Sequence, residues 1–83
     1  MDLSALSDFN LVAGHGGFGR AARASGRPKA TLSRRVSDLE ASLGTRLIER
    51  GGHSLRLTEA GALLHVRTGP LLGEIAEVGA SVG

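Results

Sequence analysis

The sequence predicts a mainly α-helical fold, a winged helix-turn-helix made of three helices and a two-stranded wing, followed by a long linker helix. Two short helical patterns are joined by a glycine-rich turn, and a longer amphipathic helix comes next. Two short strand patterns with a glycine tip follow it. Since 83 residues support one small core, we expect a helix-turn-helix domain over residues 1–57 and a linker helix over residues 58–83.

The first helix is predicted over about residues 2–13, where apolar residues recur every three to four positions and the glycine-rich "GHGG" follows. The apolar positions are Leu3, Leu6, Phe9 and Val12. Phe18 with Ala21 and Ala22 begins a second, short helix. The glycine of "SGR" stops it, and Pro28 is suited to the first turn of a third helix.

The third helix, residues 28–43, carries an apolar stripe on one face and small residues on the other. The stripe consists of Leu32, Val36, Leu39 and Leu43, and the opposite face contains Ala30, Arg34, Ser37 and Ala41. Small side chains let a helix backbone approach the major groove, and the fork of arginine matches guanine O6 and N7. Arg34 is therefore the predicted base-reading residue, with Ser33 at the edge of its face and Lys29 at the helix start.

Plainer interpretations of these residues stay open. Arg34 and Asp38 are spaced as a surface ion pair. Arg35 lies close to the apolar stripe, so it can reach a phosphate or pair with Asp38. Lys29 and Arg27 are phosphate contacts or plain surface residues.

The segments "TRLIER" and "SLRLT", separated by "GGH", predict a hairpin that forms the wing. His53 at its tip is either a solvated turn residue or a contact to the minor groove or a phosphate. Thr58 can cap the last helix from Glu59, although Gly61 stands where a full capping box has Glu or Gln.

The last helix has more apolar surface than a lone C-terminal helix can leave in water, and Pro70 interrupts its pattern. We expect it to pack against a second copy of itself. The predicted dimerisation residues are Leu63, Leu64, Leu71, Leu72, Ile75 and Val78.

Charge is strongly segregated along the chain. Residues 20–56 contain nine of the ten basic residues and three acids, a local net charge of +6 in a chain whose net charge is +2. Such a segment is typical of a phosphate-binding surface, although many basic segments are only solvated faces.

Composition argues against other classes. The chain has no cysteine, its three histidines are not at ligand spacing, and paired carboxylates or a nucleophile with a base are not found, so we expect no metal, no cofactor and no enzyme activity. No apolar run has the length of a membrane span, and "MDLSALSDF" does not resemble a signal peptide. We expect a cytoplasmic, nucleoid-associated bacterial protein.

The segments "DLSALSDFNLVAGHGGFGRAA" and "LSRRVSDLEASLGTRLIERGGHSLRLTEAG" resemble the N-terminal DNA-binding domain of LysR-type transcriptional regulators. The resemblance covers essentially the whole chain. It implies sequence-specific binding to double-stranded DNA, with the recognition helix 28–43 in the major groove and the wing 51–54 at the minor groove. It also implies a homodimer through the linker helix on an inverted-repeat operator, and allows a tetramer in a full-length protein.

The resemblance also assigns residues to the DNA. The base or groove contacts are Lys29, Ala30, Thr31, Ser33, Arg34 and His53, and the less specific phosphate contacts are Arg20, Arg27, Arg35, Arg50 and Arg56. For Arg20, Arg50 and Arg56, structural ion pairs are the alternative.

The chain departs from the family pattern in three places. Gly17 and Gly19 replace hydroxyl residues beside Phe18, and His53 replaces a common arginine. The large effector-binding domain of the family is absent from this chain, so we expect an excised domain, with a natural short protein as the alternative. The rival function is a winged-helix module that binds a protein partner.

Overall fold

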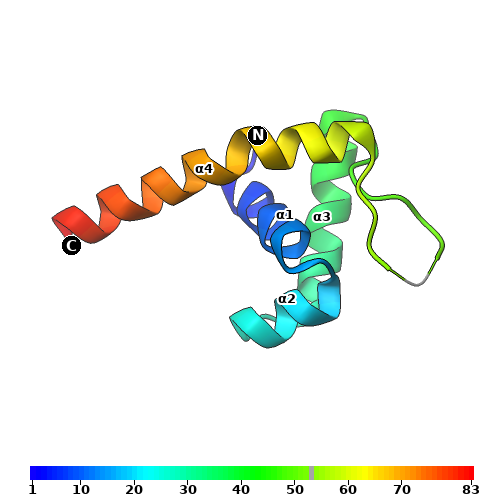
Figure 1. Ribbon diagram of the computed structural model, residues 1–83, viewed down its shortest axis with the longest axis horizontal. Coiled ribbons are helices and arrows are strands. Elements are labelled where there is room, and N and C mark those ends of the chain that lie inside the picture. The colour runs from blue at the N-terminus through cyan, green and yellow to red at the C-terminus, as the bar shows by residue number, and fades with distance from the viewer. Residues whose placement is uncertain (53) are drawn as a thin grey trace.

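The computed structural model describes residues 1–52 and 54–83, which form four α-helices and one long connection (Figure 1). The helices are α1 (Leu3–His15), α2 (Phe18–Ser25), α3 (Lys29–Leu43) and α4 (Glu59–Val82). The order and positions of the predicted helices are confirmed. Pro28 occupies the N-cap of α3 rather than its first turn.

Local capping explains where α1 begins and where the first three helices end. The Asp2 side chain accepts hydrogen bonds from the backbone N–H groups of Ser4 (2.8 Å) and Ala5 (3.4 Å) at the start of α1. Each of α1, α2 and α3 ends at a glycine with φ near +70°, a conformation that costs glycine little. These residues are Gly16, Gly26 and Gly44.

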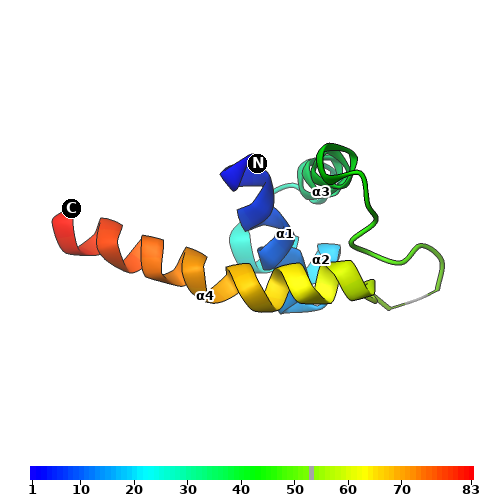
Figure 2. The ribbon, with the colours of Figure 1, turned by 90° about the horizontal axis from the view of Figure 1, so that it is seen from above.

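The hydrophobic core lies around α1, which contacts each of the other three helices. Seen from above, α1 lies between α3 and α4 (Figure 2). Burial of these side chains supplies the main stabilising free energy of the domain. The buried apolar residues are Ala5, Leu6, Phe9, Val12, Ala21, Leu32, Val36, Leu39, Leu47 and Ile48.

The wing is paired less extensively than the sequence predicts. Ile48 and Leu57 form an isolated antiparallel bridge, and the Glu49 N–H donates to the Arg56 carbonyl at 2.8 Å. No strand forms in the described residues, and φ is positive at Gly51 and Gly52, as at the tip of a turn. The mainly α-helical helix-turn-helix fold is confirmed, whereas the predicted two-stranded wing is represented in the described residues by this single bridge.

The base of the wing is attached to α3 through the buried carboxylate of Glu40. It accepts hydrogen bonds from the backbone N–H groups of Leu47 (2.8 Å) and Ile48 (3.2 Å), and it pairs with Arg50. The backbone N–H groups that follow the end of α3 therefore have a hydrogen-bond acceptor inside the domain. The helical pattern alone gave no sign of this role for Glu40.

The start of α4 is joined to the same connection at Thr58. Its hydroxyl accepts from the Gly61 N–H at 3.0 Å and donates to the Arg46 carbonyl at 2.7 Å. A Cβ added to Gly61 would lie 2.0 Å from the Leu47 carbonyl oxygen. The glycine in place of a capping-box Glu therefore permits close packing of α4 on the wing backbone.

α4 continues through Pro70 as one helix, although a proline removes one backbone hydrogen bond from a helix interior. Its first half packs on the core, and its second half extends beyond the domain body (Figure 1). Leu64 and Leu72 are partly buried against the core of their own chain. Among the described residues, none of the helices combines the length and apolarity of a membrane span.

Candidate nucleic-acid interface

The exposed face of α3 is the first part of the candidate interface. Leu32, Val36 and Leu39 are fully buried and hold the helix to the core, so the opposite face is turned to solvent. That face exposes Lys29, Ala30, Ser33 and Arg34, while Thr31 is half-buried at its edge. The predicted small-residue face with a central arginine is thus accessible.

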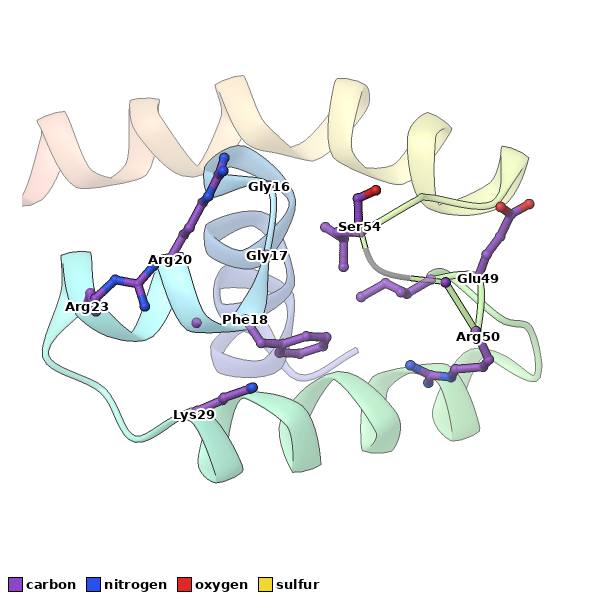
Figure 3. Close-up of a pocket in the computed structure, with 14 residues that line it drawn as sticks. Gly16, Gly17, Phe18, Arg20, Arg23, Lys29, Glu49, Arg50 and Ser54 are labelled. Atoms are coloured by element: carbon purple, nitrogen blue, oxygen red, sulfur yellow. The ribbon is translucent and has the colours of Figure 1, made fainter.

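A cationic cleft of about 590 Å³ lies beside this face, between α2 and the wing. Figure 3 shows its lining, with Phe18 between the arginines of α2 and the wing residues. The charged residues that line it are Arg20, Arg23, Lys29, Arg50 and Glu49. Four cations and one carboxylate make this cleft suitable for a polyanion.

The start of α2 opens into the cleft and carries no side-chain cap. Gly17 is the N-cap residue, and neither it nor Gly19 has a side chain that could accept from the first-turn N–H groups. Free N–H groups at a helix start, next to arginines, are suited to a phosphate oxygen. The two glycines thus remove hydroxyl groups but leave the backbone donors accessible.

Arg23 was not among the residues expected from the sequence. It lies three positions after Arg20 on α2 and lines the same cleft. Residues three apart in a helix share a face. That spacing was the available signal, since Arg20 on the same helix was already an expected phosphate contact.

Arg27 and Arg35 are placed differently from the expectation. The Arg27 guanidinium donates to both carboxylate oxygens of Asp8, at 2.8 and 3.1 Å, and Arg35 Nε lies 3.6 Å from Asp8 Oδ2. Asp8 on α1 is only 3% exposed. Both guanidinium groups thus face this buried carboxylate, and Asp8, not Asp38, pairs with Arg35.

Arg50 and Arg56 form ion pairs within the chain, the alternative that the sequence left open. Arg50 pairs with Glu40 and also lines the cleft, whereas Arg56 lies 3.6 Å from Glu49 in an exposed pair. An exposed pair of this kind adds little stability. The predicted wing-tip contact of His53 lies outside the described residues.

The expected dimerisation residues fall into two groups. Leu63, Leu71, Ile75 and Val78 are 54–63% exposed on α4. Leu64 and Leu72 contact the core of their own chain, so they are at most partly available to a partner. Val82 is also exposed and continues the apolar surface to the end of α4.

The residues that the structure describes contain no group of three or more potential ligands able to hold a metal ion. Their polar side chains are instead arranged as ion pairs, helix caps and an exposed cationic face. This arrangement matches a surface that binds an anionic polymer.

Comparison with known proteins agrees with this geometry. The family described as bacterial regulatory helix-turn-helix protein, lysR family, matches residues 3–62. The chain is 44% identical over 80 residues to an HTH-type transcriptional repressor of Pseudomonas aeruginosa, covering 96% of this chain and 25% of the relative. It is 44% identical over 71 residues to the iron-regulated virulence regulatory protein IrgB of Vibrio cholerae, covering 86% and 24%.

Solved structures share the fold. The full-length virulence activator AphB of Vibrio cholerae aligns with a TM-score of 0.91 at 35% identity, covering 99% of this chain and 28% of AphB. The BenM DBD in its complex with catB site 1 DNA aligns with a TM-score of 0.89 at 28% identity, covering 99% and 91%.

The chain spans about a quarter of the length of the curated relatives that it matches. By their names, those relatives are a transcriptional repressor and a virulence regulatory protein, and the matched part of this chain contains the helix-turn-helix region. The exposed face of α3, the cationic cleft beside it and these matches lead to one conclusion. The chain belongs to the LysR family of bacterial regulatory helix-turn-helix proteins and is a DNA-binding domain of that class.

Proposed function

We propose that this domain binds an inverted-repeat operator as a homodimer, with α3 in the major groove and residues 51–54 at the flanking minor groove. The single observation that carries the proposal is the exposed small-residue face around Arg34, which adjoins the cationic cleft between α2 and the wing. A helix in the major groove needs such a face, and the flanking DNA backbone needs such a cleft. Residues 1–57 are the DNA-binding unit and residues 58–83 the dimerisation unit.

Base reading is assigned to the exposed face of α3. Arg34 is the bidentate donor, Lys29 and Ser33 are polar contacts at its sides, and Ala30 and Thr31 contact the groove wall. Phosphate binding is assigned to Arg20 and Arg23 of α2, with Arg50 shared between Glu40 and the DNA. The BenM DBD, which shares this fold, was solved in a complex with DNA, and this supports DNA binding by the domain.

Dimerisation is assigned to the exposed apolar residues of α4. Leu71, Ile75 and Val78 are 54–63% exposed and are not among the described residues that pack on the core of their own chain. Two copies that cover these residues acquire two-fold symmetry, and a two-fold dimer reads two half-sites in opposite orientation. In a full-length protein, further contacts can assemble such dimers into tetramers.

The test is selection of bound sequences from a random DNA pool, followed by a salt titration on the selected duplex. We expect an inverted repeat, and an affinity that falls linearly with the logarithm of salt concentration as counterions are released. A pool that shows no enrichment, with salt-independent binding, would instead favour the protein-interaction module.

A further inference from the structure

The side chain of Asn10 joins α1 to the middle of α4. Its Nδ2 donates to Thr68 Oγ1 at 2.9 Å and to the Leu6 carbonyl at 3.0 Å, and its Oδ1 lies 2.8 Å from His65 Nδ1. The Thr68 hydroxyl in turn donates to the Leu64 carbonyl at 2.6 Å. We call Asn10, His65 and Thr68 the α1–α4 clamp.

The clamp is the polar part of an otherwise apolar contact. In the described part of the chain, its hydrogen bonds are those that connect side chains of α1 with α4. Both N–H bonds of the Asn10 amide and its oxygen are used, so the orientation of the amide is determined. A Cβ at Gly69 would lie 3.4 Å from Asn10 Oδ1, so the glycine leaves room for this approach.

In addition to the apolar packing of Leu64 and Leu72 on the core, two attachments hold the direction of α4. The first is Gly61, packed on the Leu47 carbonyl, and the second is the clamp at His65 and Thr68. They are separated by about one to two helical turns, roughly 10 Å at 1.5 Å per residue. Beyond the clamp, the exposed second half of α4 extends roughly 20 Å further to Val82 by the same rise per residue.

Because this part of α4 is long, a small change in its tilt moves the end of the helix by a large distance. A tilt of about 10° at Thr68 moves the end of α4 by roughly 3 to 4 Å for a helix rising 1.5 Å per residue. That displacement is close to the rise of about 3.4 Å per base pair of DNA. Because α1 packs on both α3 and α4, the clamp also determines the angle between the recognition helix and the linker.

We propose that the α1–α4 clamp sets the spacing between half-sites that the dimer accepts. The inference rests on the proposed function, since it requires a dimer joined through α4 on an inverted repeat. In such a dimer, the two recognition helices are separated by a distance and rotation that the α3–α4 angle decides. Asn10, His65 and Thr68 are thus positioning residues that select the operator without touching it.

The first experiment measures affinity on a series of operators whose half-sites are separated by one, two or three base pairs more or fewer than the optimum. The wild-type domain should bind most tightly at one half-site spacing, and its affinity should be at least tenfold lower when the spacing differs from this optimum by two base pairs. Asn10→Ala should reduce that ratio to threefold or less, and Thr68→Val should change it in the same direction by less. Affinity for a duplex with a single half-site should stay within twofold, which shows that the DNA-binding body remains folded.

Ser81→Ala is the matched control for Thr68→Val. The Ser81 hydroxyl also donates to the carbonyl four residues earlier on α4, that of Glu77, at 2.9 Å, but it is exposed and lies far along the helix from α1. Its removal should leave the spacing profile unchanged. Profiles of Asn10→Ala and wild type that coincide would overturn the inference, whereas a wild type without any optimum would overturn the proposed inverted-repeat dimer itself.

The second experiment measures the α3–α4 geometry without DNA. The chain has no cysteine, so spin labels at Ser42→Cys on α3 and Glu77→Cys on α4, both exposed positions, report one distance when labelled chains are diluted in unlabelled ones. We expect a narrow distance distribution in wild type and at least a twofold wider one with Asn10→Ala. An unchanged width would overturn the clamp, even if the DNA profile changed.

Discussion

Arg27, at the turn between α2 and α3, donates two hydrogen bonds to the buried carboxylate of Asp8 on α1, at 2.8 and 3.1 Å. Arg35 of α3 approaches the same carboxylate at 3.6 Å. One buried charge therefore connects the first helix to both sides of the helix-turn-helix. Charge-assisted, two-point pairing of this kind also specifies orientation.

Arg27→Ala should destabilise the domain by about 2 to 4 kcal/mol, because it leaves a buried carboxylate with only the more distant Arg35 as partner. Thermal and urea unfolding would measure the loss. Arg56→Ala is the matched control, since its pair with Glu49 is exposed, and we expect a change within about 0.5 kcal/mol. Equal effects of the two substitutions would show that the Asp8 pair has no special role.

Gly61→Ala should lower stability by about 2 kcal/mol or more, because its Cβ would be forced against the backbone of Leu47 at 2.0 Å. Gly73→Ala, on the same helix, meets nothing within 4 Å and should stabilise α4 by roughly 0.5 to 1 kcal/mol through helix propensity. Unfolding curves of the two variants would measure these opposite changes in the free energy of unfolding. A neutral Gly61→Ala would mean that α4 does not pack closely on the wing.

Glu40→Gln should weaken the base of the wing by about 1 to 3 kcal/mol, since the charge that pairs with Arg50 is lost. Backbone hydrogen exchange at Leu47 and Ile48 should become faster, because their N–H groups donate to this side chain. Glu49→Gln, at an exposed position, is the control and should leave both measurements near wild type. Protection that persists in Glu40→Gln would argue against this anchoring.

Ile75→Glu should convert the proposed dimer to a monomer in equilibrium sedimentation, because it places a charge within the exposed apolar surface of α4. Unfolding of the monomer itself should change little, since Ile75 is 59% exposed. This substitution is a cleaner test than removal of α4, because Leu64 and Leu72 also support the core. A dimer that persists would place the interface elsewhere.

Arg34→Ala should weaken the free energy of binding to the preferred operator by about 1 to 3 kcal/mol, since the proposed bidentate base contact is lost. The loss on random DNA should be much smaller. Arg23→Ala, which removes a cation from the cleft, should instead weaken both duplexes similarly and reduce the slope of the salt dependence by about one. Competition binding on the two duplexes measures both. Equal losses for Arg34→Ala would assign it to phosphate.

The sequence by itself determined the local elements. The three- to four-residue repeat of Leu32, Val36 and Leu39 predicted both the helix and its buried face, and glycines 16, 26 and 44 marked the ends of the helices. These features depend on neighbours within about one helical turn, so a single segment contains the information. The accessible face around Arg34 followed directly from the same repeat.

The tertiary structure alone decided which distant groups meet. Arg27 reaches Asp8 across 19 positions, Asn10 reaches His65 across 55, and Gly61 lies against the backbone of Leu47. The periodicity of apolar residues in the sequence does not predict such pairs, because the residues meet only when α1, the wing and α4 pack around one core. For that reason the sequence could assign Arg27 and Arg35 to phosphates, whereas folding places them at a buried carboxylate whose desolvation requires a partner.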